Sequence, residues 1–402
     1  MNGAAHGPLA GYRALELCET PAGAYCGRLL ALYGAEVVKV ERPGRGDRSR
    51  SVPPFAGGAP HPEKGALHLF LNAGKRSLTL DWRTRTGAGL ALALAECADA
   101  VITDLPPSDA ERWRLTPDDL LKANPRAIVT SVTAYGRSGP WARRRWSNLT
   151  AFAAGGQHYI TGDPDRPPVA TAGLQAAYQA GLHAFGATLA GLLAVMRLEI
   201  GQAVEVAAQE AQAAVLEAFL PDYAYRGALP LTKRRGNHVS AVIGIYPARD
   251  GHIGIHCMQK NFPQLAKAMN AEWMLEDERF RDNRARLAHN DELMAQFYAW
   301  AASVGKREAY RIAGETRAPV SPVNTIEDLF EDDHLLQRGF FHEVDHPDAG
   351  RLRYPGPPAR MSATPGSLSP APRLGADTDA LLRDPLGLSP AHIVTLRQRG
   401  IV

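Results

Sequence analysis

The chain has few cysteines, and they suit neither a disulfide framework nor a metal site. Only four occur in 402 residues: Cys18, Cys26, Cys97 and Cys257. None belongs to a CxxC pair or to a Cys/His cluster with zinc spacing. We therefore expect buried, reduced thiols and no bound metal, as in a cytoplasmic protein.

Long apolar runs and a large excess of charge of one sign are also missing. The longest apolar stretch, residues 184–196, is shorter than the roughly 20 residues that a membrane-spanning helix needs. Residues 1–10 are small and polar, without the apolar core of a signal peptide. The formal net charge of +3 is too small to indicate a nucleic-acid partner, although it suits a small anionic ligand such as a nucleotide. We expect a soluble cytoplasmic protein with neither a membrane nor a nucleic acid as partner.

The composition is otherwise that of a globular protein. Hydrophobic residues make up 45% of the chain and charged residues 22%, which excludes disorder of the whole chain. The length suits roughly two to three domains of about 150 residues each.

Strand and helix patterns alternate along the first third of the chain. The patterns predict strands at residues 12–17, 36–41, 77–81, 100–103 and 127–132. Between them lie helical patterns at residues 23–33, 86–97 and 117–123, the last with Thr116 as its N-cap and Pro117 at its first position. This alternation indicates βαβ units and a mainly parallel sheet. We expect a doubly wound, Rossmann-like α/β domain.

The remainder of the chain is organised differently. The patterns predict an apolar helix at 176–198 that is buried on several sides, a helix at 204–219, a hairpin at 243–255 and charged helices over 261–311. Beyond Pro319 the chain is rich in proline and reads as a long surface connection. We therefore expect a large α/β domain (1–200), a linker helix (201–225), a smaller α+β domain (226–325) and a segment that returns to the large domain (326–402).

Several common catalytic motifs are absent. The sequence has no GxSxG, Walker or HExxH motif, and no GxGxxG after a strand. A Pro-Gly-Arg-Gly loop at 43–46 follows a predicted strand, where parallel sheets bind nucleotides, and it is surrounded by Arg42, Arg45, Arg48 and Arg50. A phosphate-binding loop and a solvated basic turn fit this pattern equally well. His252 and His256 share a strand face but lack a further metal ligand, so we interpret them as structural.

A series of motifs recurs in a fixed order along nearly the whole chain. They are GAEVVKVERPG at 34–44, NAGKRSLTLD at 72–81, SVTAYGRSGP at 131–140, TGDPDRPP at 161–168, GFFHEVDHP at 339–347 and PRLGADT at 372–378. In residues and spacing the chain resembles the family III CoA-transferases, also called the CaiB/BaiF family.

The resemblance implies a fold, substrates and a binding site. It implies a large α/β domain, a smaller domain joined by long linkers, and an interlocked dimer. The substrates would be an acyl-CoA and a carboxylic acid, with CoA bound as a substrate and no permanently bound cofactor. By matching position, the adenosine and phosphate contacts of CoA fall on Arg42, Leu80, Arg83, Asp104, Leu105, Arg112 and Arg145. Arginine forks suit phosphates, and the apolar Leu80 suits adenine.

The chain departs from the family at the catalytic position. Family III transferases carry an aspartate at the start of the long helix, which attacks the acyl-CoA thioester to form a mixed anhydride and then an aspartyl-CoA thioester. That position is Ala177 here. Related racemases use a histidine and the same aspartate, and their histidine position is Ser147. The glycine-rich loop that covers the transferase site is not evident between Gly236 and Gly244.

Three hypotheses follow from this departure. The chain resembles the subunit without the aspartate in a heteromeric transferase such as succinyl-CoA:(R)-benzylsuccinate CoA-transferase, and a homologous sister subunit would then carry the aspartate. Alternatively, it is a non-catalytic CoA-thioester binding protein. A third alternative is a divergent acyl-CoA hydrolase or isomerase that uses Glu210 or His183, although the apolar neighbours of His183 favour simple packing. We favour the transferase subunit.

Overall fold

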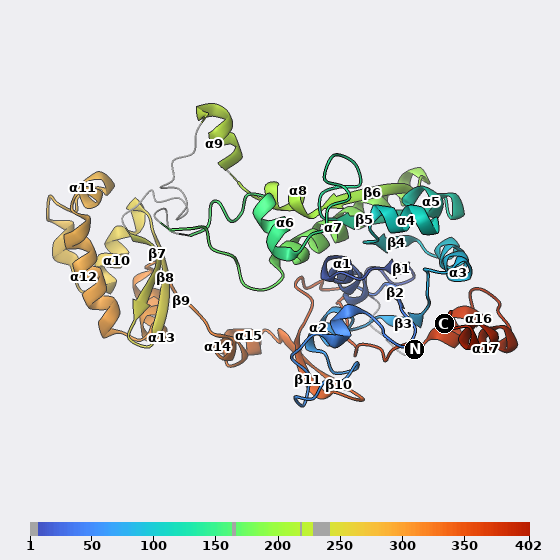
Figure 1. Cartoon of the computed structure of the whole chain (residues 1–402). Coiled ribbons are helices and arrows are strands. Elements are labelled where there is room, and N and C mark those ends of the chain that lie inside the picture. The colour runs from blue at the N-terminus through green and yellow to red at the C-terminus, as the bar shows by residue number, and fades with distance from the viewer. Residues whose placement is uncertain (1–6, 163–165, 218, 228–241) are drawn as a thin grey trace. The chain divides into compact units, whose positions relative to one another are not determined.

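The chain folds into two compact units (Figure 1). The computed structural model describes residues 7–162, 166–217, 219–227 and 242–402. The large unit comprises residues 1–158, 170–221 and 338–402, and the small unit comprises residues 159–169 and 222–337. Residues 159–162 and 166–169, which we expected in the large domain, therefore cluster with the small unit.

A six-stranded parallel sheet forms the core of the large unit. Its strand order is β3-β2-β1-β4-β5-β6, which is the order of the doubly wound dinucleotide-binding fold. The strands are β1 (Arg13–Leu17), β2 (Glu36–Glu41), β3 (Arg76–Thr79), β4 (Ala100–Thr103), β5 (Ile128–Thr133) and β6 (Gln202–Ala207). The prediction of a Rossmann-like α/β domain is confirmed.

The sixth strand corrects the predicted helix at 204–219. Val204 and Val206 alternate with Glu205, and β6 pairs with β5 in parallel register. Helix α8 (Ala208–Ala213) follows at once, and α9 (Phe219–Arg226) comes later. Residues 201–225 therefore do not form a linker helix, because residues 202–207 are a strand that completes the main sheet.

Helices cover both faces of the sheet. On one face lie α1 (Pro21–Leu32) and α7 (Gln175–Leu198). On the other lie α3 (Arg85–Glu96), α5 (Pro117–Ala123), α16 (Thr378–Arg383) and α17 (Pro390–Gln398). The expected cap of α5 is present, with Thr116 and Asp119 forming a reciprocal capping box. Shorter helices α2 (Ala66–Leu71), α4 (Pro107–Trp113) and α6 (Asn148–Ala154) lie between these elements in the chain.

Helix α7 packs tightly on α1 along one face. A Cβ atom on Gly181 would lie 2.5 Å from the Ala22 carbonyl oxygen, so the glycine permits the close crossing. The opposite face carries Leu182, Leu193 and Met196, which are exposed. The expected burial on several sides is therefore wrong for this single chain. By length and composition α7 could also cross a membrane, but the same is true of a core helix, and α7 packs on β5 and α1.

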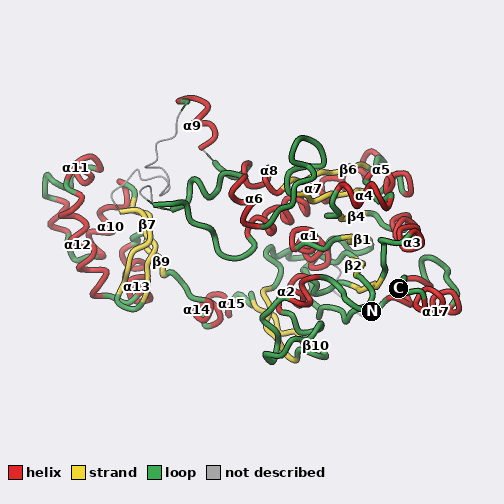
Figure 2. Tube along the Cα trace, viewed as in Figure 1, coloured by secondary structure: helices red, strands yellow, loops and turns green. Residues whose placement is uncertain are grey.

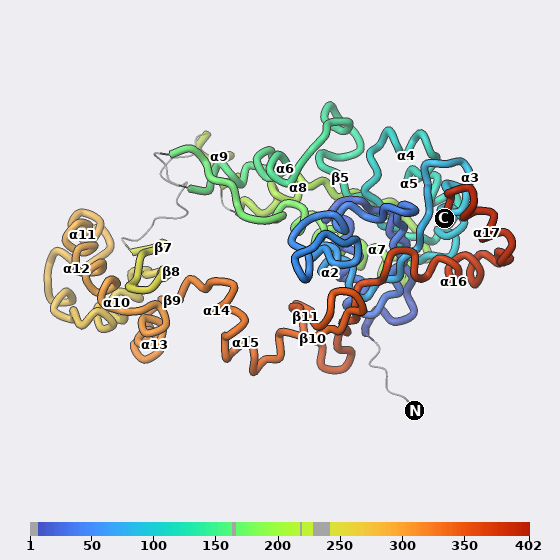
Figure 3. The backbone as a smooth tube through the Cα atoms, turned by 60° about the horizontal axis from the view of Figure 1, so that its bottom comes forward, coloured from blue at the N-terminus to red at the C-terminus, as the bar shows by residue number. Residues whose placement is uncertain are grey.

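The C-terminal segment runs beside the N-terminal part of the large unit (Figure 3), where its hydrogen bonds reach the end of α1 and β3. It begins with an antiparallel hairpin, β10 (Phe341–His346) and β11 (Gly350–Pro355), which the proline-rich sequence did not lead us to expect. Further on, the Gly375 N–H donates to Ser77 Oγ at 2.9 Å, and the Asp81 N–H donates to the Ile401 carbonyl at 2.7 Å. Residues 371–402 are thereby joined to the end of β3.

The small unit is built on three antiparallel strands in the order β7-β8-β9. The strands are β7 (Val242–Ala248), β8 (Gly251–Cys257) and β9 (Val320–Pro322), so the predicted hairpin is present. Four helices lie beside the sheet (Figure 2): α10 (Phe262–Ala268), α11 (Asn283–Ala288), α12 (Asn290–Ser303) and α13 (Lys306–Thr316). Two short helices, α14 (Ile326–Phe330) and α15 (Asp333–Gln337), follow β9 in the chain and lie away from the sheet. Phe297, Phe280 and Leu265 are fully buried in the core of this unit.

All four cysteines are free, but they are not all buried. Cys18, Cys26 and Cys257 are buried as expected, whereas Cys97 is exposed. Cys97 is the C-cap of α3, where the chain leaves the helix at the protein surface.

Candidate functional site

A cleft of about 680 Å³ opens in the large unit at the carboxyl ends of the strands. Its wall is formed by Thr20 and Pro21 after β1, by residues 104–109 after β4 and by residues 132–134 at the end of β5. The loop 142–148 and the start of α7 complete it. Strands β2 and β3 are added on one side of β1, and β4, β5 and β6 are added on the other side. The switch point between β1 and β4 is where doubly wound sheets bind ligands.

Positive charge dominates the lining of the cleft. Four arginines line it, Arg48, Arg143, Arg144 and Arg145, against two aspartates, Asp104 and Asp109. Arg143 pairs with Glu111 at 3.1 Å, and the Arg144 guanidinium stacks on Trp141 with 4.9 Å between its carbon and the ring centre. Such a lining favours an anionic ligand, because guanidinium groups offer paired donors to phosphate or carboxylate oxygens.

Asp104 joins the ends of β1 and β4 at the floor of the cleft. Its carboxylate accepts the Glu19 N–H at 2.8 Å and the Thr20 N–H at 2.6 Å. Burial raises the pKa of Asp104 to about 7, although these N–H donors act in the opposite direction. Asp104 therefore fixes the loop after β1 through both of its carboxylate oxygens.

The first turn of α7 presents a methyl group to the cleft. Ala177 lines the cleft and is 3% exposed. Its N–H donates to Asn148 Oδ1 at 3.1 Å, while Asn148 Nδ2 donates to the Gly173 carbonyl at 3.1 Å. Asn148 thus ties the start of α6 to the start of α7, and α7 itself has no acidic residue in its described first turn.

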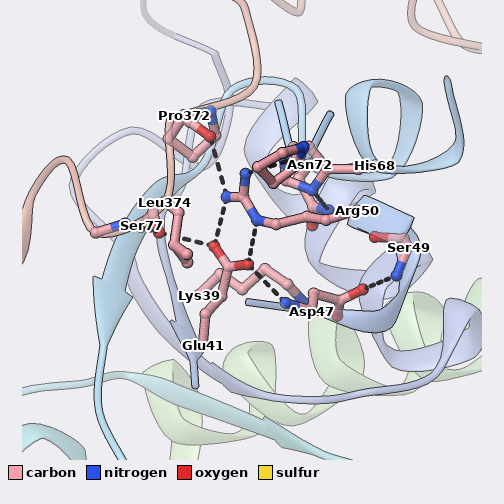
Figure 4. A network of polar contacts seen from close by, with 12 residues as sticks. Lys39, Glu41, Asp47, Ser49, Arg50, His68, Asn72, Ser77, Pro372 and Leu374 are labelled. Carbon is pink, nitrogen blue, oxygen red and sulfur yellow. Dashed lines mark hydrogen bonds and ion pairs between the residues drawn. The ribbon is translucent and has the colours of Figure 1, made fainter. Parts of the chain in front are cut away.

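A network of buried ion pairs holds Asp47 and Arg50, on either side of Arg48 in the chain (Figure 4). Arg50 binds both carboxylate oxygens of Glu41, at 2.7 and 2.8 Å, and binds Glu63 at 2.6 Å. Lys39 Nζ lies 2.9 Å from the Asp47 carboxylate. Because these ion pairs fix Asp47 and Arg50 inside the protein, Arg48 between them is directed outward to the cleft.

The structure brings together part of the predicted CoA site. Of the predicted CoA contacts, Asp104, Leu105 and Arg145 line the cleft, together with Ala177 at the position of the family aspartate. Arg42 and Arg83 do not line it, but both contact the carboxylate of Glu19, the residue next to the lining residue Thr20. Arg112 lies on α4, exposed, with its guanidinium carbon 5.1 Å from the ring centre of Trp113.

Leu80 does not fit the role that the resemblance gave it. Its side chain is fully buried in the core between the sheet and α3, so it has no surface to offer an adenine ring.

Neither alternative catalytic residue lies in the cleft lining. His183 is exposed on α7, with Nδ1 2.8 Å from the Gln179 carbonyl, so the expectation that it is packed is wrong. Glu210 is exposed on α8. Ser147 lines the cleft but caps α6 through the Thr150 N–H. The turn at 163–165 lies outside the described residues. So do residues 236–241 of the segment 236–244, in which the sequence showed no glycine-rich loop.

Sequence reasoning missed several functional residues of the cleft. Arg143 and Arg144 were visible as a run of arginines but had no assigned role, and nothing in the sequence indicated that Asn148 holds Ala177. Of the arginines around the 43–46 loop, Arg48 faces the cleft while Arg50 is buried. The sequence does not distinguish these two roles, because nothing in the local pattern shows which of the neighbouring arginines is buried.

Comparison with known proteins agrees with this arrangement. The family model described as CoA-transferase family III matches residues 9–378. Two relatives from Chloroflexus aurantiacus are the alpha and beta subunits of succinyl-CoA–L-malate CoA-transferase. The alpha subunit is 32% identical over 98% of this chain and 92% of its own length, and the beta subunit is 31% identical over 98% of each. A crystal structure of a CaiB/BaiF family protein from Brucella suis superposes with a TM-score of 0.85 at 28% identity, covering 94% of this chain and all of the other. The chain therefore belongs to the family III CoA-transferases.

Proposed function

We propose that this chain is the non-nucleophilic subunit of a heteromeric family III CoA-transferase in the cytoplasm. It binds a CoA thioester in the arginine-lined cleft, and a homologous sister subunit supplies the catalytic aspartate. The observation that carries the proposal is that Ala177 lines the cleft at the first turn of α7. By the family resemblance, this is the position of the nucleophilic aspartate.

The charge and place of the cleft support binding of CoA. CoA carries a diphosphate and a further phosphate, and the guanidinium groups of Arg48, Arg144 and Arg145 suit such groups. The cleft volume of about 680 Å³ is within the usual range of pockets that bind small molecules and cofactors. The strand ends and the switch point are where such a fold binds nucleotides.

The same cleft supports a passive role in the transfer step. A thioester is converted to an anhydride only if a carboxylate attacks its carbonyl carbon and the CoA thiolate leaves. Asp104, the carboxylate at the cleft floor, accepts two backbone N–H groups and maintains the β1 loop. This use of both oxygens leaves Asp104 poorly placed to attack a substrate.

A sister subunit is supported by the relatives. Succinyl-CoA–L-malate CoA-transferase of Chloroflexus aurantiacus has alpha and beta subunits, and both resemble this chain over nearly its whole length. Subunits of one family can thus divide a single enzyme between them. The relatives also suggest succinyl-CoA as the donor and a dicarboxylic acid as the acceptor.

The test restores the missing carboxylate. The purified chain, Ala177→Asp and Gly186→Asp are each incubated with succinyl-CoA, and covalent adducts are measured by mass spectrometry. Gly186 is on the same helix but has no heavy atom within 4 Å of an added Cβ, so its variant is a matched control. We expect an acyl or CoA adduct, and exchange of CoA with succinate, only in Ala177→Asp.

Other outcomes favour the alternatives. Turnover by the unmodified chain, lost in Glu210→Gln or His183→Ala, would indicate a divergent hydrolase or isomerase and would refute the proposal. Tight CoA binding with no adduct in Ala177→Asp, and no stable complex with any homologous subunit encoded alongside it, would indicate a stand-alone CoA-thioester binding protein.

A further inference from the structure

Two arginines that the family resemblance places at the CoA phosphates, Arg42 and Arg83, lie outside the cleft lining but contact Glu19, the neighbour of the lining residue Thr20. Arg42 places Nε at 2.7 Å and Nη2 at 2.5 Å from Glu19 Oε1. Arg83 Nη2 lies 3.4 Å from the same oxygen. One carboxylate oxygen of Glu19 is therefore shared by two guanidinium groups.

The sheet brings these three residues together from distant parts of the sequence. Glu19 follows β1, Arg42 follows β2 and Arg83 follows β3, and parallel strands end at the same edge. The loop with Glu19 is fixed because its N–H donates to Asp104. Arg83 is oriented by stacking on Trp82, with 4.6 Å from its guanidinium carbon to the ring centre. The contact is thus built by the fold and not by a chance meeting of long surface side chains.

The position of Glu19 matters for an anionic ligand. Glu19, Arg42 and Arg83 are partly exposed, with 29%, 26% and 34% of their side-chain surfaces open, so a ligand can reach them. Two positive charges and one negative charge leave a net charge of +1 where a phosphate group would otherwise meet +2. A carboxylate oxygen on both guanidinium groups also occupies donors that a phosphate oxygen needs.

We propose that Glu19 is a built-in competitor of the CoA phosphates, which holds Arg42 and Arg83 in the empty site and must be displaced or outcompeted when CoA binds. The inference rests on the proposed function, because it concerns the same ligand. By this inference, Glu19 weakens the binding of CoA and speeds its release.

The test measures CoA affinity directly by calorimetric titration at low and moderate salt. Glu19→Gln keeps the shape and removes the charge, and we expect CoA to bind about tenfold more tightly, equivalent to 1.4 kcal/mol. We also expect a steeper loss of affinity with added salt, because two unpaired guanidinium groups then face the phosphates. Glu19→Asp keeps the charge and should remain near the affinity of the unmodified chain.

Glu36→Gln is a matched control. Glu36 also bridges two arginines, with Arg13 Nε at 3.2 Å and Arg76 Nη1 at 2.5 Å, but it lies at the first position of β2, at the opposite edge of the sheet. It loses the same charge, so unchanged CoA affinity in Glu36→Gln shows that the effect of Glu19→Gln is local.

Each remaining outcome has a defined meaning. Unchanged or weaker CoA binding in Glu19→Gln, with measurable binding by the unmodified chain, overturns the inference and leaves the proposed function standing; Glu19 would then act as a support for the arginines. If neither the unmodified chain nor Glu19→Gln binds CoA, the proposed CoA site itself is refuted, and the inference with it.

Discussion

Replacing Arg50 with methionine should destabilise the large unit by about 3 kcal/mol at pH 7. Arg50 is 1% exposed and forms a two-point ion pair with Glu41, a second ion pair with Glu63 and a hydrogen bond to the Pro372 carbonyl. Methionine fills a similar volume but leaves two carboxylates without their cation. Breaking a buried ion pair by removing one partner costs about 3–5 kcal/mol.

The pKa of Glu41 gives an independent value for the stability that this ion pair contributes. Burial alone would raise this pKa, but the hydrogen bonds and charge of Arg50 outweigh burial and lower it from 4.5 to about 2. A difference of that size corresponds to about 3 kcal/mol. Because the pKa is lower in the folded state, the stabilisation is present above about pH 4.5 and is lost as the pH falls from there towards 2. The deficit of Arg50→Met should therefore be largest at neutral pH and shrink in acid.

The assay is urea unfolding followed by tryptophan fluorescence at pH 7 and at pH 3.5. Hydrogen exchange of the Leu374 and Gly375 amides adds a local readout, because they donate to Glu63 and Ser77 beside Arg50. The control is Arg45→Met, an exposed arginine five residues away. A loss below about 1 kcal/mol at pH 7, or an equal loss at both pH values, would refute the reasoning.

Two further predictions concern the elements that shape the cleft. Gly181→Ala should lower stability by about 1–3 kcal/mol, because its Cβ would meet the Ala22 carbonyl at 2.5 Å, whereas Gly186→Ala on the same helix should be neutral or stabilise by up to about 1 kcal/mol; equal melting temperatures would contradict the close crossing. For Asp104, whose pKa is raised to about 7, the folded state holds a proton that the unfolded state has lost between about pH 4 and pH 7, so the stability of the unmodified chain should fall with rising pH relative to Asp104→Asn. Parallel melting curves across pH 5–8 would show that Asp104 does not titrate in this range.

Local sequence patterns were reliable where one element decides its own structure. The short apolar strands β1 to β5, the Thr116 cap of α5 and the turn between β7 and β8 were all predicted within a few residues. They depend on neighbouring residues, and the physical causes, burial of a short apolar run and capping of a helix end, act over short distances. The order of family motifs was equally readable, and with it the absence of an aspartate at Ala177.

Patterns failed where tertiary contacts decided between alternatives. The Ala-rich stretch after residue 201 reads as a helix, yet Val204 and Val206 complete the sheet because β5 offers an unpaired edge. The family resemblance placed Leu80 at the adenine of CoA, yet it is a core residue, because the alternation that begins in β3 turns its side chain towards α3.

The sequence thus indicated the α/β class, the family and an alanine at position 177, since each depends on local order and residue identity. Only the tertiary structure decided which charges meet. Glu19, Arg42 and Arg83 come from three strand ends that are separated in sequence and become neighbours because parallel strands end at one edge. Arg48 and Arg50, two residues apart, have opposite fates because Glu41 and Glu63 draw Arg50 into the interior. Charge pairing across a fold depends on distances that no local pattern encodes.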